Sequence, residues 1–179
     1  MRPVADGTTP AITVRTLAPA ETVRLGERLG HALRAGDVVL LRGDLGAGKT
    51  HFARGIAAGL GIAGPVPSPT FTLANEYHGT NAAGEAVPLA HLDLYRLMDG
   101  GGGESGGDLD SVGLPDYFGG EWAAVVEWPE GAMLAGFVPP SYLDVALADA
   151  GETERQLTFT AHGVAVRLLD ALTGEVGEV

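Results

Sequence analysis

Short apolar runs alternate with amphipathic stretches along this chain, a pattern typical of strands alternating with helices. Residues 11–17 alternate between apolar and polar side chains, and residues 38–41 are continuously apolar, as in a buried parallel strand. Further strand patterns cover residues 71–77, 87–95, 122–126, 142–147 and 156–160. Apolar positions at helical spacing predict helices over residues 20–34, from near Lys49 to residues 59–61, and over residues 164–172.

Prolines and polar turns indicate where these elements begin and end. Pro19 is expected to start the first helix, because its missing N–H is not needed there. Three prolines keep residues 65–70 extended, since proline lacks a donor and disfavours helical geometry in the residue before it. A polar turn at residues 78–84 joins the flanking strands into a hairpin, and residues 109–118 form a short helix broken at Pro115.

The length and composition indicate one domain. The 179 residues suit a domain of residues 11–172, with a disordered tail at residues 1–10 and a short tail at residues 173–179. The glycine-rich residues 99–107 are a predicted flexible insertion. The chain has no cysteine for disulfides or thiolate metal sites, and no apolar run near the ~20 residues of a membrane span. We therefore expect a cytoplasmic protein without membrane contact.

The segment that follows the buried strand carries the most specific chemical pattern. Residues 43–50 read Gly-Asp-Leu-Gly-Ala-Gly-Lys-Thr, the P-loop pattern G-x-x-x-x-G-K-T, between a predicted strand and a predicted helix. Backbone N–H groups of such a loop surround phosphates, the lysine reaches the terminal phosphates, and the threonine hydroxyl ligates Mg²⁺. We expect ATP or GTP to bind here, at Asp44, Leu45, Gly46, Ala47, Gly48, Lys49, Thr50 and His51.

The order of elements predicts an α/β fold like that of P-loop NTPases: a mixed, mostly parallel sheet with helices on both faces and an added antiparallel hairpin. Ligands of such sheets lie beyond the carboxyl ends of the parallel strands. Glu127 closes an apolar strand there and is a candidate to hold Mg²⁺, directly or through water. Asp93 is a candidate to orient water or ligate metal; alternatively it is an ion-pair partner of Arg96.

Three further residues have open roles. Thr70 lies in the proline-framed segment, where P-loop hydrolases often place a residue that senses the γ-phosphate; alternatively its hydroxyl caps a strand. His91 is expected to be packed or on the surface. Trp128 is expected in the core, or as a wall of the site beside the preceding glutamate.

The charge balance bears on nucleic-acid binding. The chain has 23 acidic and 11 basic residues and a formal net charge of −12. Binding to a phosphate backbone depends on lysines and arginines, so this chain is not expected to hold RNA by itself. A role on RNA would be delivered through a partner.

Taken together, the motifs resemble those of the TsaE family, small bacterial ATPases that take part in forming threonylcarbamoyladenosine at position 37 of tRNAs. Residues 12–165 carry the likeness. Its motifs are the P-loop GDLGAGKT at 43–50, SPTF at 68–71, HLDLYR at 91–96, GLPDYF at 113–118 and VEWPE at 126–130. The glycine-rich stretch after Arg96 departs from the family pattern.

The resemblance implies roles for individual residues. Lys49 and Thr50 would do the usual P-loop work, with Thr50 and Glu127 as Mg²⁺ ligands. Asp93 and Thr70 would serve hydrolysis or nucleotide sensing, and Trp128 would support the site. Family members act with TsaD and TsaB, which would hold the tRNA. The preference for ATP over GTP is also implied by the resemblance, and no N-K-x-D motif for guanine is present.

Two other functions remain open from the residues. One is a P-loop kinase that phosphorylates a small molecule; such kinases carry arginines over the transferred phosphate, and the second half of this chain offers only Arg96, Arg155 and Arg167. The other is a nucleotide-dependent binding switch with negligible hydrolysis.

Overall fold

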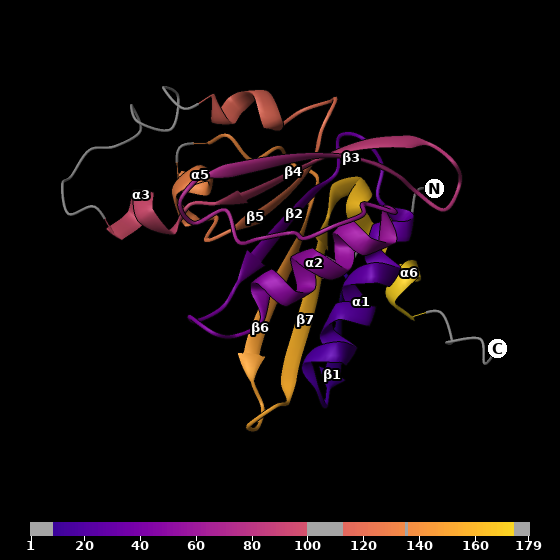
Figure 1. Cartoon of the computed structure of the whole chain (residues 1–179), viewed down its shortest axis with the longest axis vertical. Coiled ribbons are helices and arrows are strands. Elements are labelled where there is room, and N and C mark those ends of the chain that lie inside the picture. Colours follow the sequence, from indigo (N-terminus) through magenta and orange to yellow (C-terminus); the bar gives the residue numbers. More distant parts are fainter. Residues whose placement is uncertain (1–8, 100–112, 135, 174–179) are drawn as a thin grey trace, which may run out of the picture.

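The molecule is built on one seven-stranded sheet (Figure 1). It is seen in a computed structural model that describes residues 9–99, 113–134 and 136–173. The strands lie in the order β1-β7-β6-β2-β5-β4-β3. Their bounds are β1 Ala11–Thr16, β2 Val38–Arg42, β3 Ala74–Thr80, β4 Ala86–Asp93, β5 Ala123–Glu127, β6 Tyr142–Asp149 and β7 Arg155–His162.

Parallel pairing is confined to the centre of the sheet. β2 pairs in parallel with β5 and with β6, and β5 pairs in parallel with β4. β3 is antiparallel to β4, β7 to β6 and β1 to β7. The predicted mixed α/β sheet with an added hairpin is confirmed. Three of the strand pairs named here are parallel and three antiparallel, so the expectation of a mostly parallel sheet is corrected to a parallel centre flanked by antiparallel pairs.

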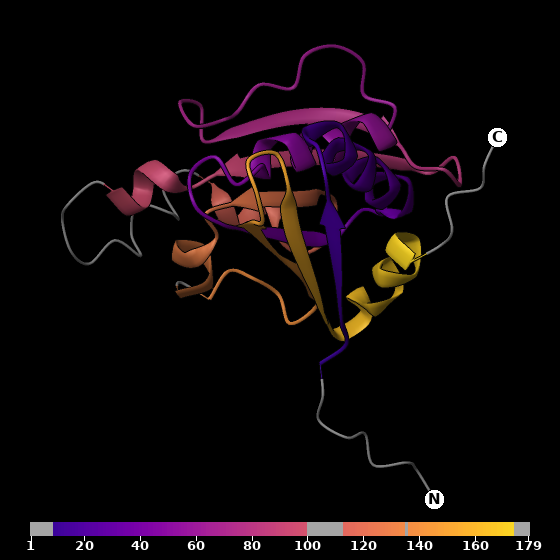
Figure 2. The same cartoon turned by 90° about the horizontal axis from the view of Figure 1, so that it is seen from below.

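The long helices cover one face of the sheet (Figures 1 and 2). α1 Pro19–Ala32, α2 Lys49–Gly59 and α6 Arg167–Thr173 bury their apolar side chains there against alternate residues of the strands. The other face is covered by shorter elements, including the 3₁₀ helix η1 Leu114–Tyr117 and α5 Glu130–Leu134. The remaining short helices are α3 Tyr95–Asp99 and the 3₁₀ helix η2 Gly163–Val166. None of the helices in the described residues could span a membrane.

α1 and α2 approach each other through four glycines. Gly26 and Gly30 of α1 face α2, and Gly55 and Gly59 of α2 face α1. A Cβ at any of these positions would lie 2.1–2.3 Å from a backbone oxygen of the partner helix. The glycines therefore allow the two backbones to touch, which fixes α2 on the sheet.

Several element bounds differ from those expected. β3 begins at Ala74 rather than at residue 71, because the N–H groups of Thr72 and Leu73 close a turn on the Pro69 carbonyl. The hairpin turn lies at residues 81–85, where the Asn81 side chain accepts hydrogen bonds from the N–H groups of residues 83 and 85.

The expected helix over residues 109–118 is also corrected. Pro115 lies in the first turn of η1, where it needs no donor, and does not break a helix; residues 109–112 lie outside the described part. The predicted last helix is divided into η2 and α6. Of the predicted tails at residues 1–10 and 173–179 and the predicted insertion at residues 99–107, residues 1–8, 174–179 and 100–107 lie outside the described part. Within it, residue 99 ends α3, residue 173 ends α6, and the Pro10 carbonyl accepts a hydrogen bond from the Ala161 N–H, so these ends belong to the fold.

Candidate functional site: a phosphate loop with two buried carboxylates

The loop between β2 and α2 takes a conformation that requires glycine. Gly43, Gly46 and Gly48 have φ values of 148°, 82° and 102°, a region that side-chain-bearing residues rarely adopt. A Cβ on Gly43 would also lie 2.5 Å from the Leu147 carbonyl oxygen of β6. This conformation turns the loop around the N-terminus of α2, where unpaired N–H groups can meet an anion.

Lys49 lies folded within the loop. Its Nζ donates hydrogen bonds to the Gly43 and Asp44 carbonyl oxygens, at 2.5 and 2.9 Å, and lies 4.2 Å from the centre of the Trp128 ring. Burial lowers the pKa of Lys49, an effect opposed foremost by the negative charge of Glu127. Bound phosphate would supply further negative charge at this partly desolvated ammonium group.

Arg155 supports the loop from the other side. This residue begins β7, and its Nε and Nη2 donate to the Ala47 and Gly46 carbonyl oxygens at 3.1 and 3.3 Å. It also forms an ion pair with Asp149, at 3.1 Å. The β6–β7 hairpin thus fixes the phosphate loop, a role for Arg155 that its sequence context did not indicate.

Glu127 ends β5 beside the start of α2. The Thr50 hydroxyl donates to Glu127 Oε1 and Oε2, at 3.1 and 3.3 Å. His91 Nε2 lies 2.8 Å from Oε1, and Glu127 and His91 are 3% and 1% exposed. The hydroxyl and the imidazole together hold the carboxylate against the end of the loop.

Asp93 ends β4 directly beside Glu127, its partner in the parallel ladder. Oδ1 accepts from the Tyr95 backbone N–H, and Oδ2 accepts from the Thr70 hydroxyl, both at 2.9 Å. Thr70 shares a further hydrogen bond with Ser68, at 2.7 Å. The segment that carries Thr70 therefore meets β4 at this carboxylate.

The alternative ion-pair partner of Asp93 is not found at this carboxylate. Arg96 lies over the Phe71 ring, 5.1 Å from its centre, and no ion pair joins it to Asp93 within the described residues. The alternative in which Arg96 pairs with Asp93 is therefore wrong.

One cleft of about 360 Å³ brings most of the expected residues together. Lys49, Thr50, Thr70, Asp93 and Glu127 all line it. The full lining is Leu45, Gly46, Gly48, Lys49, Thr50, His51, Arg54, Ser68, Thr70, Asp93, Glu127 and Trp128. Of the expected binding residues, Asp44 is exposed outside this lining, and Ala47 is buried beneath the loop, 3% exposed.

Two residues of the site were missed. His91 is buried, which was one of the two expected placements, but its contact with Glu127 was not expected. His91 lies two residues before Asp93 in a strand, so both side chains are on the same face, and this spacing could have indicated that His91 belongs to the site. Arg54 lines the cleft one helical turn after Thr50, and that spacing was the available signal. Trp128 is a wall of the site, with a φ of 56° that turns the chain after β5.

The oxygen donors fit a magnesium ion bound together with a phosphate. Thr50 offers a hydroxyl and Glu127 a carboxylate, which are hard ligands of the kind that Mg²⁺ prefers. No group of three or more His, Cys, Asp or Glu side chains in the described residues could hold a metal alone. Mg²⁺ commonly completes its shell with water and substrate phosphates, and these two ligands suit that mode.

Comparisons with known proteins agree on one family. A sequence model described as "Threonylcarbamoyl adenosine biosynthesis protein TsaE" matches residues 16–157. The chain is 39% identical to the tRNA threonylcarbamoyladenosine biosynthesis protein TsaE of Bacillus subtilis, over 83% of this chain and 85% of that protein. It is 46% identical to the protein of the same name from Mycobacterium leprae, over 71% and 76% of the two chains.

A solved structure extends this likeness to the fold. The crystal structure of Bacillus subtilus YdiB superposes with a TM-score of 0.73 and 34% sequence identity. The match covers 94% of this chain and 97% of that chain. The phosphate loop and both buried carboxylates lie within the residues that the family matches. The chain belongs to the TsaE family.

Proposed function

We propose that this protein is a Mg²⁺-dependent ATPase subunit that supports the formation of threonylcarbamoyladenosine at position 37 of tRNAs, acting with TsaD and TsaB. The observation that carries the proposal is the convergence of Asp93 and Glu127 on the phosphate loop, in one cleft. A phosphate loop alone suffices to bind a nucleotide, whereas hydrolysis of the nucleotide also needs metal ligation and a group that orients water. The family relationship supplies the pathway.

Five polar side chains of the cleft have a part in the proposed reaction. Thr50 and Glu127 would hold Mg²⁺, which neutralises charge on the phosphates when bound. Asp93, fixed by Thr70 and by the Tyr95 N–H, orients the attacking water. Lys49 binds the terminal phosphates in place of its present carbonyl partners.

The charge of the protein supports a dependence on partners. With a net charge of −12, the chain offers few cations for a tRNA backbone, so in this proposal the partners hold the tRNA. The protein acts in the cytoplasm, where tRNAs are modified. ATP is the proposed nucleotide because of the family relationship.

The kinase alternative is weakened by where the arginines lie. Arg155 bonds the phosphate loop from behind, Arg96 lies over Phe71, and Arg167 pairs with Asp37 beyond the cleft. Within the described residues, none of these three lines the cleft. A kinase would carry such arginines on a lid over the transferred phosphate, whereas Arg54, the arginine that does line the cleft in the described residues, belongs to α2.

Phosphate release from ATP tests the proposal. The purified protein with Mg²⁺ is expected to hydrolyse ATP slowly, and faster when TsaD and TsaB are added. Phosphate transferred to a small acceptor would instead establish the kinase. Partner binding that needs ATP and is unchanged when Asp93→Ala abolishes turnover would establish the switch.

A further inference from the structure

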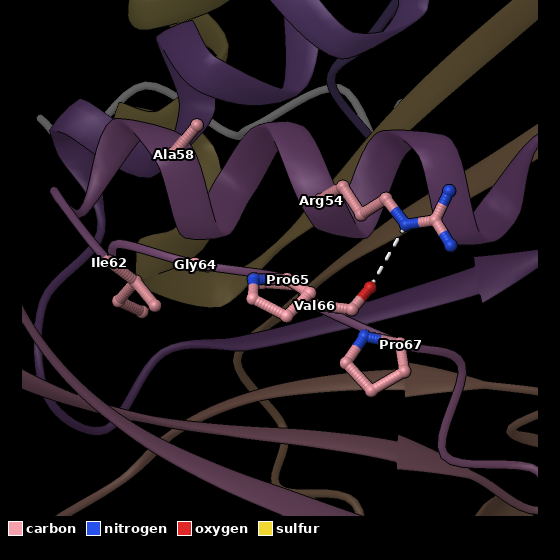
Figure 3. A pocket seen from close by; sticks show the side chains of 7 residues that line it. All are labelled: Arg54, Ala58, Ile62, Gly64, Pro65, Val66 and Pro67. Atoms are coloured by element: carbon pink, nitrogen blue, oxygen red, sulfur yellow. Dashed lines mark hydrogen bonds between the residues drawn. The ribbon is translucent and has the colours of Figure 1, made fainter.

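Arg54 lies between the nucleotide cleft and a neighbouring groove. It lines the cleft together with Thr50 and Thr70. It also lines a groove of about 460 Å³ between α2 and residues 65–70, here called the proline-containing segment (Figure 3). The groove is lined by Arg54, Ala58, Ile62, Gly64, Pro65, Val66 and Pro67. Arg54 is therefore placed to connect the proline-containing segment with the cleft.

The two ends of the guanidinium group have different surroundings. Nε donates to the Val66 carbonyl oxygen at 2.9 Å. The Nη nitrogens point away from Ala58, toward the N-terminal end of α2 (Figure 3). Thr50 lies at that end, one helical turn or about 6 Å before Arg54 along the axis and on the same face. The charged tip of the side chain thus points to the phosphate-binding end.

Two cationic and two acidic side chains line the cleft. Lys49 and Arg54 are the cations of the lining, and Asp93 and Glu127 are its acids. Without Arg54 the lining would carry a net negative charge before any nucleotide entered. Lys49 Nζ is already bonded to two loop carbonyls, whereas Arg54 uses only Nε toward the described part of the chain. Arginine presents several donors in a planar fork that suits phosphate.

We propose, on the basis of the ATP site above, that Arg54 reads the terminal phosphate of ATP and transmits its presence to the proline-containing segment. In this proposal its Nη nitrogens bind the γ-phosphate at the side of the cleft where the Thr70 hydroxyl bonds Asp93. Its Nε keeps the Val66 carbonyl in place. Because Thr70 follows four residues after Val66 and bonds Asp93, the phosphate that distinguishes ATP from ADP stabilises the position of the water-orienting acid.

Nucleotide affinities test the first half of this inference. Equilibrium binding of the β,γ-imido analogue of ATP and of ADP, both with Mg²⁺, is compared between wild type and Arg54→Gln. We expect the ATP analogue to bind roughly tenfold or more weakly, the usual effect of losing a charge-assisted hydrogen bond, and ADP to change less than about threefold. Arg24→Gln, in an exposed arginine of α1 paired with Glu21, is the matched control.

Amide hydrogen exchange tests the second half. In the wild type the ATP analogue should slow exchange in residues 66–73 more than ADP does, and this difference should vanish in Arg54→Gln. Arg54→Lys keeps the charge but replaces the separate Nε and Nη donors of the planar fork with one ammonium group, so it should retain ADP binding and lose part of the discrimination. If Arg54→Gln does not fold, the lysine variant decides the question by the same two measurements.

The outcomes separate this inference from the proposed function. Equal loss of affinity for both nucleotides, or no loss for either, would overturn the role of Arg54 and leave the ATPase proposal intact. Failure of the wild type to bind ATP would overturn both. An altered affinity ratio without altered exchange would overturn the transmission to residues 66–73.

Discussion

The first turn of α2 and its later turns contact the rest of the protein in opposite ways. At its start, Thr50 meets Glu127 through hydrogen bonds between side chains, in a cleft with charges of both signs. Farther along, Gly55 and Gly59 meet α1 with no side chain at all, so that backbone touches backbone. The contact at the start of α2 depends on polar side-chain atoms, whereas the contact with α1 depends on the absence of side chains. Substitutions should therefore affect turnover in one region and stability in the other.

The largest expected effect is a loss of ATP turnover when either buried acid of the cleft, Glu127 or Asp93, is substituted. Glu127→Gln and Asp93→Asn should each lower ATP turnover roughly 100-fold or more, because each removes a charge from the reacting end of the cleft. Glu127→Gln should also raise the Mg²⁺ concentration needed for half-maximal turnover, whereas Asp93→Asn should not. Glu121→Gln, which changes an exposed glutamate, is the control. Unchanged turnover and Mg²⁺ dependence in Glu127→Gln would remove the metal assignment.

Gly55→Ala tests the other region. The added Cβ would lie 2.1 Å from the Val23 carbonyl oxygen, so α2 must move away from α1. Overpacking of this kind should lower the free energy of unfolding by about 3 kcal/mol, measured by urea denaturation. Turnover of the folded fraction should fall much less than in the variants of the two acids, because the altered contact lies beyond the cleft-lining residues of α2. Gly120→Ala, whose Cβ would contact nothing within 4 Å, is the matched control. Equal stability of both variants would contradict the contact.

His91 tests how firmly Glu127 is held. His91→Phe removes the imidazole that contacts Oε1 and should lower turnover roughly 10- to 100-fold, as for other groups that orient a metal ligand. ADP affinity measured without Mg²⁺ should stay near that of the wild type. His91→Gln retains a donor and should recover part of the turnover. If both variants lose turnover equally, the imidazole fills space and does not orient the carboxylate.

The smallest expected effect lies outside both regions. The Tyr117 hydroxyl donates to Glu76 Oε1 at 2.6 Å, and this hydrogen bond, aided by burial, raises the pKa of Tyr117 to about 12. Because the folded-state pKa exceeds the ordinary value of 10, the stabilisation is complete below pH 10 and is lost as the pH rises toward 12. The difference in unfolding free energy between wild type and Tyr117→Phe should therefore shrink above pH 10. A difference that grows above pH 10 would contradict the assignment.

Much of the cleft could be predicted because its residues are defined by local pattern. The P-loop has fixed spacing, and Asp93 and Glu127 each end an apolar strand, so the rule that ligands lie beyond parallel strands brings them together. The start of β3 was misplaced because a turn closed on Pro69 shows no alternation to reveal it.

The contact between α1 and α2 could not be predicted in the same way. A glycine four residues from another glycine acquires meaning only when the facing helix is known, and no periodicity in apolar residues marks it. The support of the loop by Arg155 likewise depends on β7 lying near β2, which is a consequence of the strand order. Such contacts arise from the whole fold and not from a local stretch.

The pairing of β1 with β7 has a consequence for how the protein is made. Thr13 and Thr158 lie side by side although 145 residues separate them in the chain. During synthesis β1 can therefore pair with β7 only after all the other strands of the sheet have left the ribosome. Closing so long a segment costs conformational entropy and slows folding. We expect the nascent chain to acquire this edge of the sheet last, with β1 accessible to chaperones until then.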